Sequence, residues 1–284
     1  MEMYFCPLFS GSSGNALFCQ YGYTRLLIDA GKPGRAIEEA LRSIGVDPGT
    51  LSGILVTHEH SDHIQGVGVL ARRHGLPVYA TSGTWLGMEG KIGKIPPELR
   101  REFYAGRDFY LGDLGVVSFP IPHDAQEPVG FRLYGGNLSV STATDLGCFT
   151  REVYDQIAGS SLILLESNHD PDMLRRNPHY SSALKARILG ERGHLSNESC
   201  AKALRALVNA GTGTVLLGHL SGENNTPELA MRVNTDYLGL EDIQPGRDVT
   251  LNVAQRDTRG PVYIIRETHS APGSRQQVTE PSSE

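Results

Sequence analysis

The sequence has few cysteines, and their spacing suits neither a thiolate metal site nor a disulfide framework. Cys6, Cys19, Cys148 and Cys200 are scattered along 284 residues, and no two of them form a C-x-x-C pattern. Thiolate zinc sites and disulfide-rich folds both need closer, paired spacing. We therefore expect these cysteines to be ordinary buried thiols.

Long apolar runs and an excess of basic residues are also missing. No stretch approaches the roughly 20 apolar residues needed to cross a bilayer, and residues 1–6 lack the basic start and apolar core of a signal peptide. The sequence therefore predicts a cytoplasmic protein with no membrane partner. The formal net charge of −6 disfavours nonspecific nucleic-acid binding over the whole surface. A polyanionic substrate remains compatible with a site that holds divalent cations.

Short strands and helices alternate along the chain in two halves. The predicted strands are 4–9, 16–21, 25–29, 53–57, 77–80, 114–120, 129–133, 138–142, 162–166 and 214–217, with 249–253 and 262–266 as a closing pair; the predicted helices are 34–44, 64–73, 181–190, 197–209 and 226–237. This alternation predicts an α/β fold with two mixed sheets and helices on the outer faces, an αββα sandwich. We expect one domain over residues 1–268 and a disordered tail over 269–284, which is rich in Ser, Pro, Gln and Glu.

Metal-ligand side chains follow the predicted strand 53–57 at once, in the run His58-Glu59-His60-Ser61-Asp62-His63. Histidines two apart on an extended turn can share one metal ion, while Asp62 and His63 face a neighbouring position. Imidazole and carboxylate ligands suit zinc, with manganese or iron as alternatives. A solvated surface turn is the other interpretation, but four such residues within six favour a metal site.

The run Val56–His63 resembles the signature of the metallo-β-lactamase superfamily. The resemblance implies that fold, two divalent metal ions and further ligands at His123, Asp145 and His219, each of which follows a predicted strand. It implies that His58, His60 and His123 hold one ion, that Asp62, His63 and His219 hold the second, and that Asp145 bridges them. It also matches Asp29 to a residue that supports the ligand loop without binding metal.

Asp145 and Cys148 bear on the branch of the superfamily. The best-known β-lactamases use a cysteine at the second metal ion, whereas the matching residue here is Asp145, and Cys148 comes three residues later. This difference disfavours an antibiotic hydrolase. It favours phosphodiesterases, thioesterases and oxygen-handling relatives.

His194 is a histidine beyond the implied ligand set. It precedes the predicted helix 197–209, and the strand 162–166 ends in the acid Glu166. Nucleases that resemble tRNase Z and RNase J carry a histidine in this place. The resemblance implies that Asp62, His194 and Glu166 are catalytic, with His194 at the leaving group and Glu166 orienting it. The alternative is that His194 only caps its helix near Ser196.

Several further motifs resemble those of the bacterial YycJ (WalJ) family, over about residues 3–240. They include Ser10–Asn15, the run after Glu166 and the run Gly218–Asn225. The resemblance implies a metal-dependent exonuclease whose partner is nucleic acid, DNA in particular, with a part in DNA repair. Between Asp145 and His219 there is no room for a β-CASP insertion, and no tRNA-binding arm is evident.

Two segments are candidates for contact with phosphate. Backbone N–H groups of the glycine-rich loop, at Ser12, Ser13, Gly14 and Asn15, could bind a phosphate, although such loops are often only turns. Basic residues Lys91, Lys94, Arg100 and Arg101 could contact a nucleic-acid backbone, although a solvated loop explains them equally well. His169 and His179 are further candidates near the site, although such histidines are more often supporting or surface residues.

Two other functions stay open at this stage. A small-molecule hydrolase, such as a glyoxalase II-like thioesterase, would use the same ligands. A non-hydrolytic di-iron oxygen sensor would also use them. The choice between zinc and manganese, between DNA and RNA and between exo and endo action stays open, as does the oligomeric state.

Overall fold

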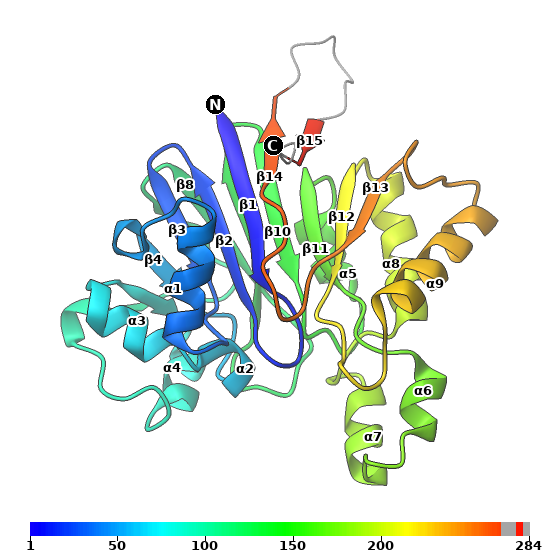
Figure 1. The fold of residues 1–284 in the computed structure, drawn as a ribbon, viewed down its shortest axis with the longest axis horizontal. Coiled ribbons are helices and arrows are strands. Elements are labelled where there is room, and N and C mark those ends of the chain that lie inside the picture. Colours follow the sequence, from blue (N-terminus) through cyan, green and yellow to red (C-terminus); the bar gives the residue numbers. More distant parts are fainter. Residues whose placement is uncertain (268–276, 281–284) are drawn as a thin grey trace.

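The computed structural model describes residues 1–267 and 277–280, which form two β-sheets with helices packed around them (Figure 1). The first sheet has the strand order β15-β14-β1-β2-β3-β4-β5-β6. Its strands are β1 (Glu2–Phe9), β2 (Ala16–Tyr21), β3 (Thr24–Ile28), β4 (Gly53–Leu55), β5 (Val78–Ala80), β6 (Arg100–Glu102), β14 (Tyr263–Arg266) and β15 (Gln277–Thr279). Neighbours are antiparallel from β15 to β3 and parallel from β3 to β6, so the sheet is mixed.

The second sheet is mixed as well and has the order β13-β12-β11-β10-β9-β8-β7. Its strands are β7 (Phe109–Leu111), β8 (Leu114–Pro120), β9 (Val129–Gly135), β10 (Leu138–Ala143), β11 (Leu162–Glu166), β12 (Thr214–Gly218) and β13 (Thr250–Val253). Strands β10 to β13 are parallel to one another, and β7 to β10 are antiparallel.

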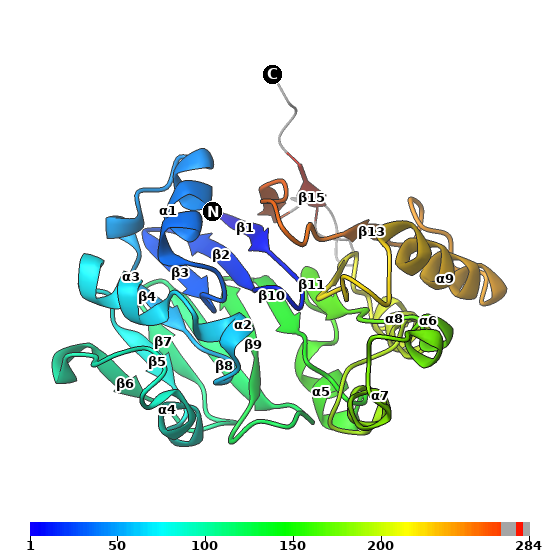
Figure 2. The same ribbon diagram turned by 60° about the horizontal axis from the view of Figure 1, so that its bottom comes forward.

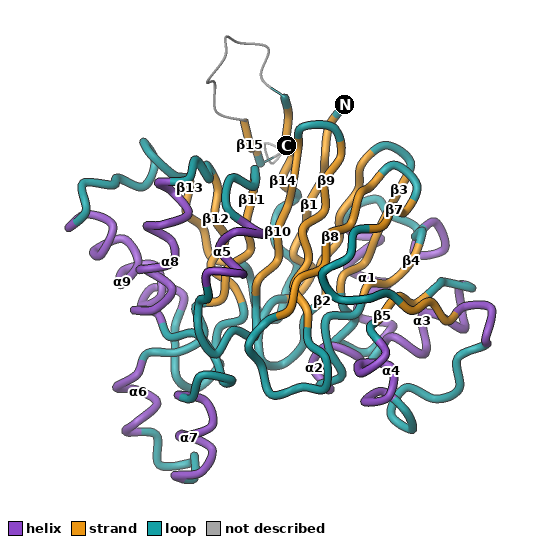
Figure 3. The backbone as a smooth tube through the Cα atoms, turned by 180° about the vertical axis from the view of Figure 1, so that it is seen from behind, coloured by secondary structure: helices purple, strands orange, loops and turns teal. Residues whose placement is uncertain are grey.

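The helices fall into two groups, one beside each sheet (Figure 2). The first group is α1 (Gly34–Ser43), α2 (Ser61–Ile64), α3 (Val67–His74) and α4 (Ser82–Met88), and the second is α5 (Arg151–Ile157), α6 (Pro171–Arg176), α7 (Ser182–Leu189), α8 (Asn197–Asn209) and α9 (Pro227–Leu240); two short 3-10 turns lie at Pro48–Thr50 and Pro97–Leu99. Figure 3 shows α5 lying over the second sheet, with α8 and α9 beyond it. None of the helices in the described ranges combines the length and apolar character needed to span a membrane.

Alternation along the strands explains this layering. In β3, Leu26 and Ile28 pack between the two sheets, while Leu27 points to the layer under α1 and α3. In β11, Leu162 and Leu164 face the inter-sheet core, and Ile163 packs under the second group of helices. Successive side chains of a strand point to opposite faces of the sheet, so each of these strands contributes side chains to two cores. The predicted αββα sandwich is confirmed.

The carboxyl ends of the parallel strands position the polar residues of interest. Asp29 follows β3, Asp145 follows β10, Glu166 ends β11 and His219 follows β12. Parallel strands bring such positions to one edge of a sheet, where α/β proteins place their ligands.

Several predicted elements differ from the structure. The helix predicted over 64–73 corresponds to α3, which begins only at Val67. Ile64 ends the separate helix α2, because the chain breaks at Gln65 and Gly66, and the Gly66 amide donates to Ala30 O at 2.7 Å. The predicted closing pair is wrong, since β13 joins β12 whereas β14 joins β1 in the other sheet. Helices α4, α5 and α6 and strands β6 and β7 were not predicted.

The predicted disordered tail falls largely outside the described residues, at 269–276 and 281–284. Disorder is the wrong prediction for Gln277–Thr279, which form β15 and pair with β14. The edge of β14 offers unpaired backbone groups to an extended segment, and Val278 packs against the inter-sheet core.

Candidate metal centre

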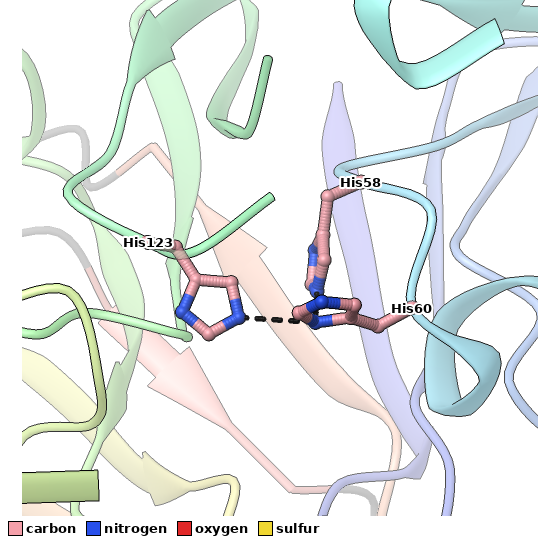
Figure 4. A group of neighbouring side chains, drawn as sticks. All are labelled: His58, His60 and His123. Carbon is pink, nitrogen blue, oxygen red and sulfur yellow. Dashed lines mark hydrogen bonds between the residues drawn. The ribbon is translucent and has the colours of Figure 1, made fainter. Parts of the chain in front are cut away.

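Three histidine rings converge at the end of β4, as Figure 4 shows. His58 and His60 stand in the loop between β4 and α2, and His123 follows β8 from the second sheet. The distance from His60 Nδ1 is 3.1 Å to His58 Nε2 and 3.2 Å to His123 Nε2. The predicted first ligand set is therefore brought together, from both sheets, with one nitrogen of each ring facing a common centre.

A second group lies beside the first. His63 Nε2 and His219 Nε2 each lie 3.5 Å from Asp62 Oδ2. Asp62 and His63 belong to α2, and His219 follows β12. These three residues are the predicted second ligand set, and the fold brings them together from α2 and the end of β12.

Asp145 stands between the two groups. Its Oδ2 lies 3.4 Å from His63 Nε2, and its Oδ1 lies 3.7 Å from His123 Nε2. The carboxylate thus faces one histidine of each group, as expected of a bridging residue.

Buried ligand atoms without partners indicate that the cluster is built to hold cations. Within the described residues, His219 Nε2 and Asp145 Oδ2 are buried and have no hydrogen-bond partner. Buried polar atoms are rarely left in this state. Burial lowers the pKa of His58 well below its usual range, and the neighbouring imidazoles lower it further, so its ring is neutral and able to bind a metal ion. Nitrogen and carboxylate donors in this arrangement suit divalent metal ions.

Asp29 orients the second group from behind, as predicted for a supporting residue. Its Oδ2 lies 2.8 Å from His63 Nδ1, and its two oxygens accept hydrogen bonds from the amide and hydroxyl of Thr57, both at 2.8 Å. This leaves His63 Nε2 pointing into the cluster. Asn15, from the loop after β1, adds a contact of 3.1 Å between its Nδ2 and that nitrogen.

Glu166 is the centre of a buried hydrogen-bond network on the other side of the cluster. Its Oε1 lies 2.9 Å from His194 Nδ1, which is the predicted contact, and 2.7 Å from His219 Nδ1, which the sequence did not predict. Its Oε2 accepts from the amides of Leu146 and Leu195. Burial raises the pKa of this carboxyl, but the two histidines hold it below its usual value. Glu166 is therefore ionised and fixes two imidazoles at once.

His194 lies beside the cluster, with its ring centroid 5.2 Å from that of His123 and 5.3 Å from that of His219. Burial lowers its pKa, but Glu166 and Asp145 raise it above the ordinary value. The cap of α8 is supplied by Ser196, whose hydroxyl accepts from the amide of Ser199 at 3.2 Å.

Three residues of the site hold an uncommon backbone conformation. Asp29, Asp145 and His219 have φ angles of 60°, 61° and 54°. Left-handed backbone is unusual for residues other than glycine and often occurs at functional sites. Asp29 and His219 directly follow β3 and β12, and Asp145 comes two residues after the end of β10. The sharp turn at each position sends the side chain into the cluster.

The glycine-rich loop is only partly available to a phosphate. The amide of Gly14 donates to Gly11 O at 2.9 Å and that of Asn15 donates to Asp62 O at 2.8 Å. Both residues are buried, so their predicted role in binding phosphate is wrong. Ser12 and Ser13 are exposed and line a cavity next to Asp62.

The four predicted basic contacts are not brought together. Lys91 lines the same cavity as Ser12 and Asp62 and donates to Glu59 O at 3.2 Å, so it lies beside the loop that carries His58 and His60. Lys94 and Arg100 line a separate cavity, where Arg100 lies over the ring of Trp85. Arg101 is exposed in β6 and donates to a backbone carbonyl.

Comparison with known proteins agrees with this geometry. The model of the β-lactamase superfamily domain matches residues 24–220. The exodeoxyribonuclease YycJ of Bacillus anthracis is 42% identical over 230 residues, which are 81% of this chain and 87% of the relative. The exodeoxyribonuclease WalJ of Streptococcus pneumoniae strain D39 is 38% identical over 91% of this chain and 96% of the relative.

A solved structure shows the same fold. The metallo-β-lactamase fold protein YhfI of Bacillus subtilis superposes with a TM-score of 0.66 at 15% identity, over 91% of this chain and 99% of that protein. Together with the ligand cluster, these matches show that the chain belongs to the metallo-β-lactamase superfamily and, within it, to the YycJ/WalJ family.

Proposed function

We propose that this protein is a metal-dependent exonuclease that hydrolyses phosphodiester bonds in DNA. The observation that carries the proposal is His194, which Glu166 holds beside two ligand groups that do not include it, His58-His60-His123 and Asp62-His63-His219. Relatives named exodeoxyribonucleases, which this chain matches over 87% and 96% of their lengths, support the substrate class.

The ligand sets support two divalent metal ions, zinc or manganese, with iron as an alternative. His58, His60 and His123 would hold one ion, Asp62, His63 and His219 would hold the other, and Asp145 would bridge them. When bound, two such ions lower the pKa of a water molecule and neutralise charge on the phosphate.

The chain's own residues supply position and proton transfer. Asp62 is the least buried of the carboxylates in the cluster, with its side chain 24% exposed, so it can orient the attacking water. His194 Nδ1 forms a hydrogen bond with Glu166, and the ring lines a small cavity beside the cluster. Its Nε2 is thus the atom that would donate a proton to the leaving oxygen. Glu166 keeps that ring in one orientation.

An end-labelled nuclease assay tests the proposal. Single- and double-stranded DNA and RNA are incubated with manganese or zinc and with wild type, His58→Ala or His194→Ala. His179→Ala is the matched control, because that histidine is exposed and contributes to none of the ligand groups. We expect stepwise shortening of DNA by wild type and the control, and loss of activity in the other two variants.

The outcomes separate the alternatives. Turnover of a glutathione thioester, with no cleavage of any nucleic acid by metal-loaded protein, would replace the proposal with a thioesterase. Visible di-iron absorption without hydrolysis would indicate an oxygen sensor. Unchanged phosphodiester turnover by His194→Ala would show that His194 has no catalytic role.

A further inference from the structure

Helix α7 has an apolar face that serves none of the protein's cores. Leu184 and Ile188 stand four residues apart, on one side of the helix, and both are half-buried. None of the residues of α7 is fully buried. In Figure 1 the hairpin of α6 and α7 projects away from the two sheets. An apolar face placed outside the core needs another explanation.

This face lines a hollow that opens onto the reaction site. The hollow measures about 150 Å³ and is lined by Leu184 and Ile188 together with Tyr180 and His194. The backbone ties the two parts together, because the amide of His194 donates to Ile188 O at 3.0 Å. The hollow therefore lies on the side of the cluster where His194 would meet the leaving group.

Polar groups at the rim suit a ligand with polar edges. Asn168 and Ser12 line the hollow, and so does Arg187, which forms an ion pair with Asp124. The hydroxyl of Tyr180 contacts Ser221 and Asn224, in the loop after His219, so the ring is tied to the ligand loop.

These features fit a nucleobase, which has flat apolar faces and a polar edge. Aromatic side chains that line nucleic-acid sites stack on bases of any sequence. The volume has room for one small planar group and not for a length of polymer. We infer that the hollow takes the base of the terminal nucleotide, stacked on Tyr180, and that the enzyme thereby selects strand ends. The inference rests on the proposed nuclease function.

Oligonucleotides that lack one terminal base test it. Single-stranded DNA carries either a normal nucleotide or an abasic tetrahydrofuran at the 5′ end, or the same pair at the 3′ end, and the rate of the first cleavage is measured. Stacking on an aromatic ring changes affinity by roughly 5- to 150-fold. We expect an abasic unit at the attacked end to raise KM by about tenfold for the wild type.

Variants at position 180 identify the ring. Tyr180→Ala should raise KM for normal DNA by about tenfold and abolish the discrimination against the abasic end, whereas Tyr180→Phe should keep it. Tyr23→Ala is the matched control, because Tyr23 is 97% exposed and lies in the β2–β3 turn. Circular single-stranded DNA should stay intact.

The inference has an outcome of its own that would overturn it. Wild-type protein that shortens linear DNA stepwise but treats abasic and normal ends alike, at both ends, contradicts base binding in the hollow. That result does not depend on whether Tyr180→Ala folds. Metal-loaded wild type that cleaves no DNA, or that cleaves circular and linear DNA at equal rates, would instead overturn the proposed exonuclease function.

Discussion

The two halves of the molecule, each built on one sheet, supply the candidate metal centre in different ways. In the half built on the first sheet, here called the N-terminal half, four of the candidate ligands come from the short run His58–His63, which one loop and α2 hold together. In the half built on the second sheet, here called the C-terminal half, the candidate ligands His123, Asp145 and His219 follow three different strands. Local geometry positions the first group, while the second depends on the register of a whole sheet.

The supporting residues differ in the same way. Asp29 contacts Thr57 and His63, so it serves only the ligand loop of its own half. Glu166 contacts His219 and also His194, so it joins metal binding to the proposed proton transfer. The C-terminal half thus combines two tasks that a single substitution can disturb.

Removal of the metal ions acts on both halves and should have the largest effect. Chelation should abolish activity, and added manganese or zinc should restore it. Metal at about a thousand times its Kd stabilises the fold by about 4 kcal/mol, which corresponds to a rise in Tm of roughly 10 °C. Differential scanning calorimetry of chelated and reloaded protein measures the shift. The rise in Tm on reloading should be smaller for His58→Ala than for wild type. Equal rises in the two proteins would mean that the cluster is not the metal-binding site.

Glu166→Gln and Asp29→Asn should distinguish a residue that supports metal binding alone from one that also positions His194. Loss of such a supporting residue lowers metal affinity or activity by roughly 10- to 100-fold. Excess metal should rescue Asp29→Asn, because Asp29 contacts only the ligand loop. It should not rescue kcat in Glu166→Gln, since His194 stays misplaced. Titration of activity against metal concentration distinguishes them, and full rescue of both variants would erase the contrast between the halves.

Ser10 joins the two halves, and its substitution should have a moderate effect. Its buried hydroxyl accepts from the amide of His219 at 3.1 Å. Ser10→Ala leaves that amide unpaired, which costs about 1–3 kcal/mol and should lower Tm by several degrees. Ser43→Ala, at the exposed end of α1, is the control and should change stability by less than about 0.5 kcal/mol.

The same contrast decides what the sequence could predict. Strand β11 and helix α8 were predicted at their observed bounds, because their hydrophobic patterns are local. The run His58–His63 was recognised for the same reason. The contact of Glu166 with His219 was not predicted, because the two residues meet only once β11 pairs with β12. The pairing of β13 and β14 with strands of different sheets was also not predicted, because the residues of a strand do not specify which strand it pairs with.

The smallest expected effect is a pH dependence of folding stability that His169 gives to the C-terminal half. Neither of its ring nitrogens has a hydrogen-bond partner within the described part of the chain, and burial lowers its pKa to about 4. The unfolded chain, where the pKa is about 6.5, binds the proton first as the pH falls. The folded state therefore loses stability below about pH 6.5, by about 1 kcal/mol between pH 7 and 5.5. Above pH 6.5 this group has little effect.

The measurement compares wild type with His169→Leu, both after chelation, so that metal release does not contribute. Urea unfolding at pH 7 and 5.5 should show a loss in wild type that exceeds the loss in the variant by about 1 kcal/mol. Hydrogen exchange at pH 5.5 should then accelerate around the β11 end and the start of α8, where His169 bridges to Ser196, before it does around α2. Equal losses in both proteins would mean that His169 is solvated in the folded state, and the two halves would respond to acid alike.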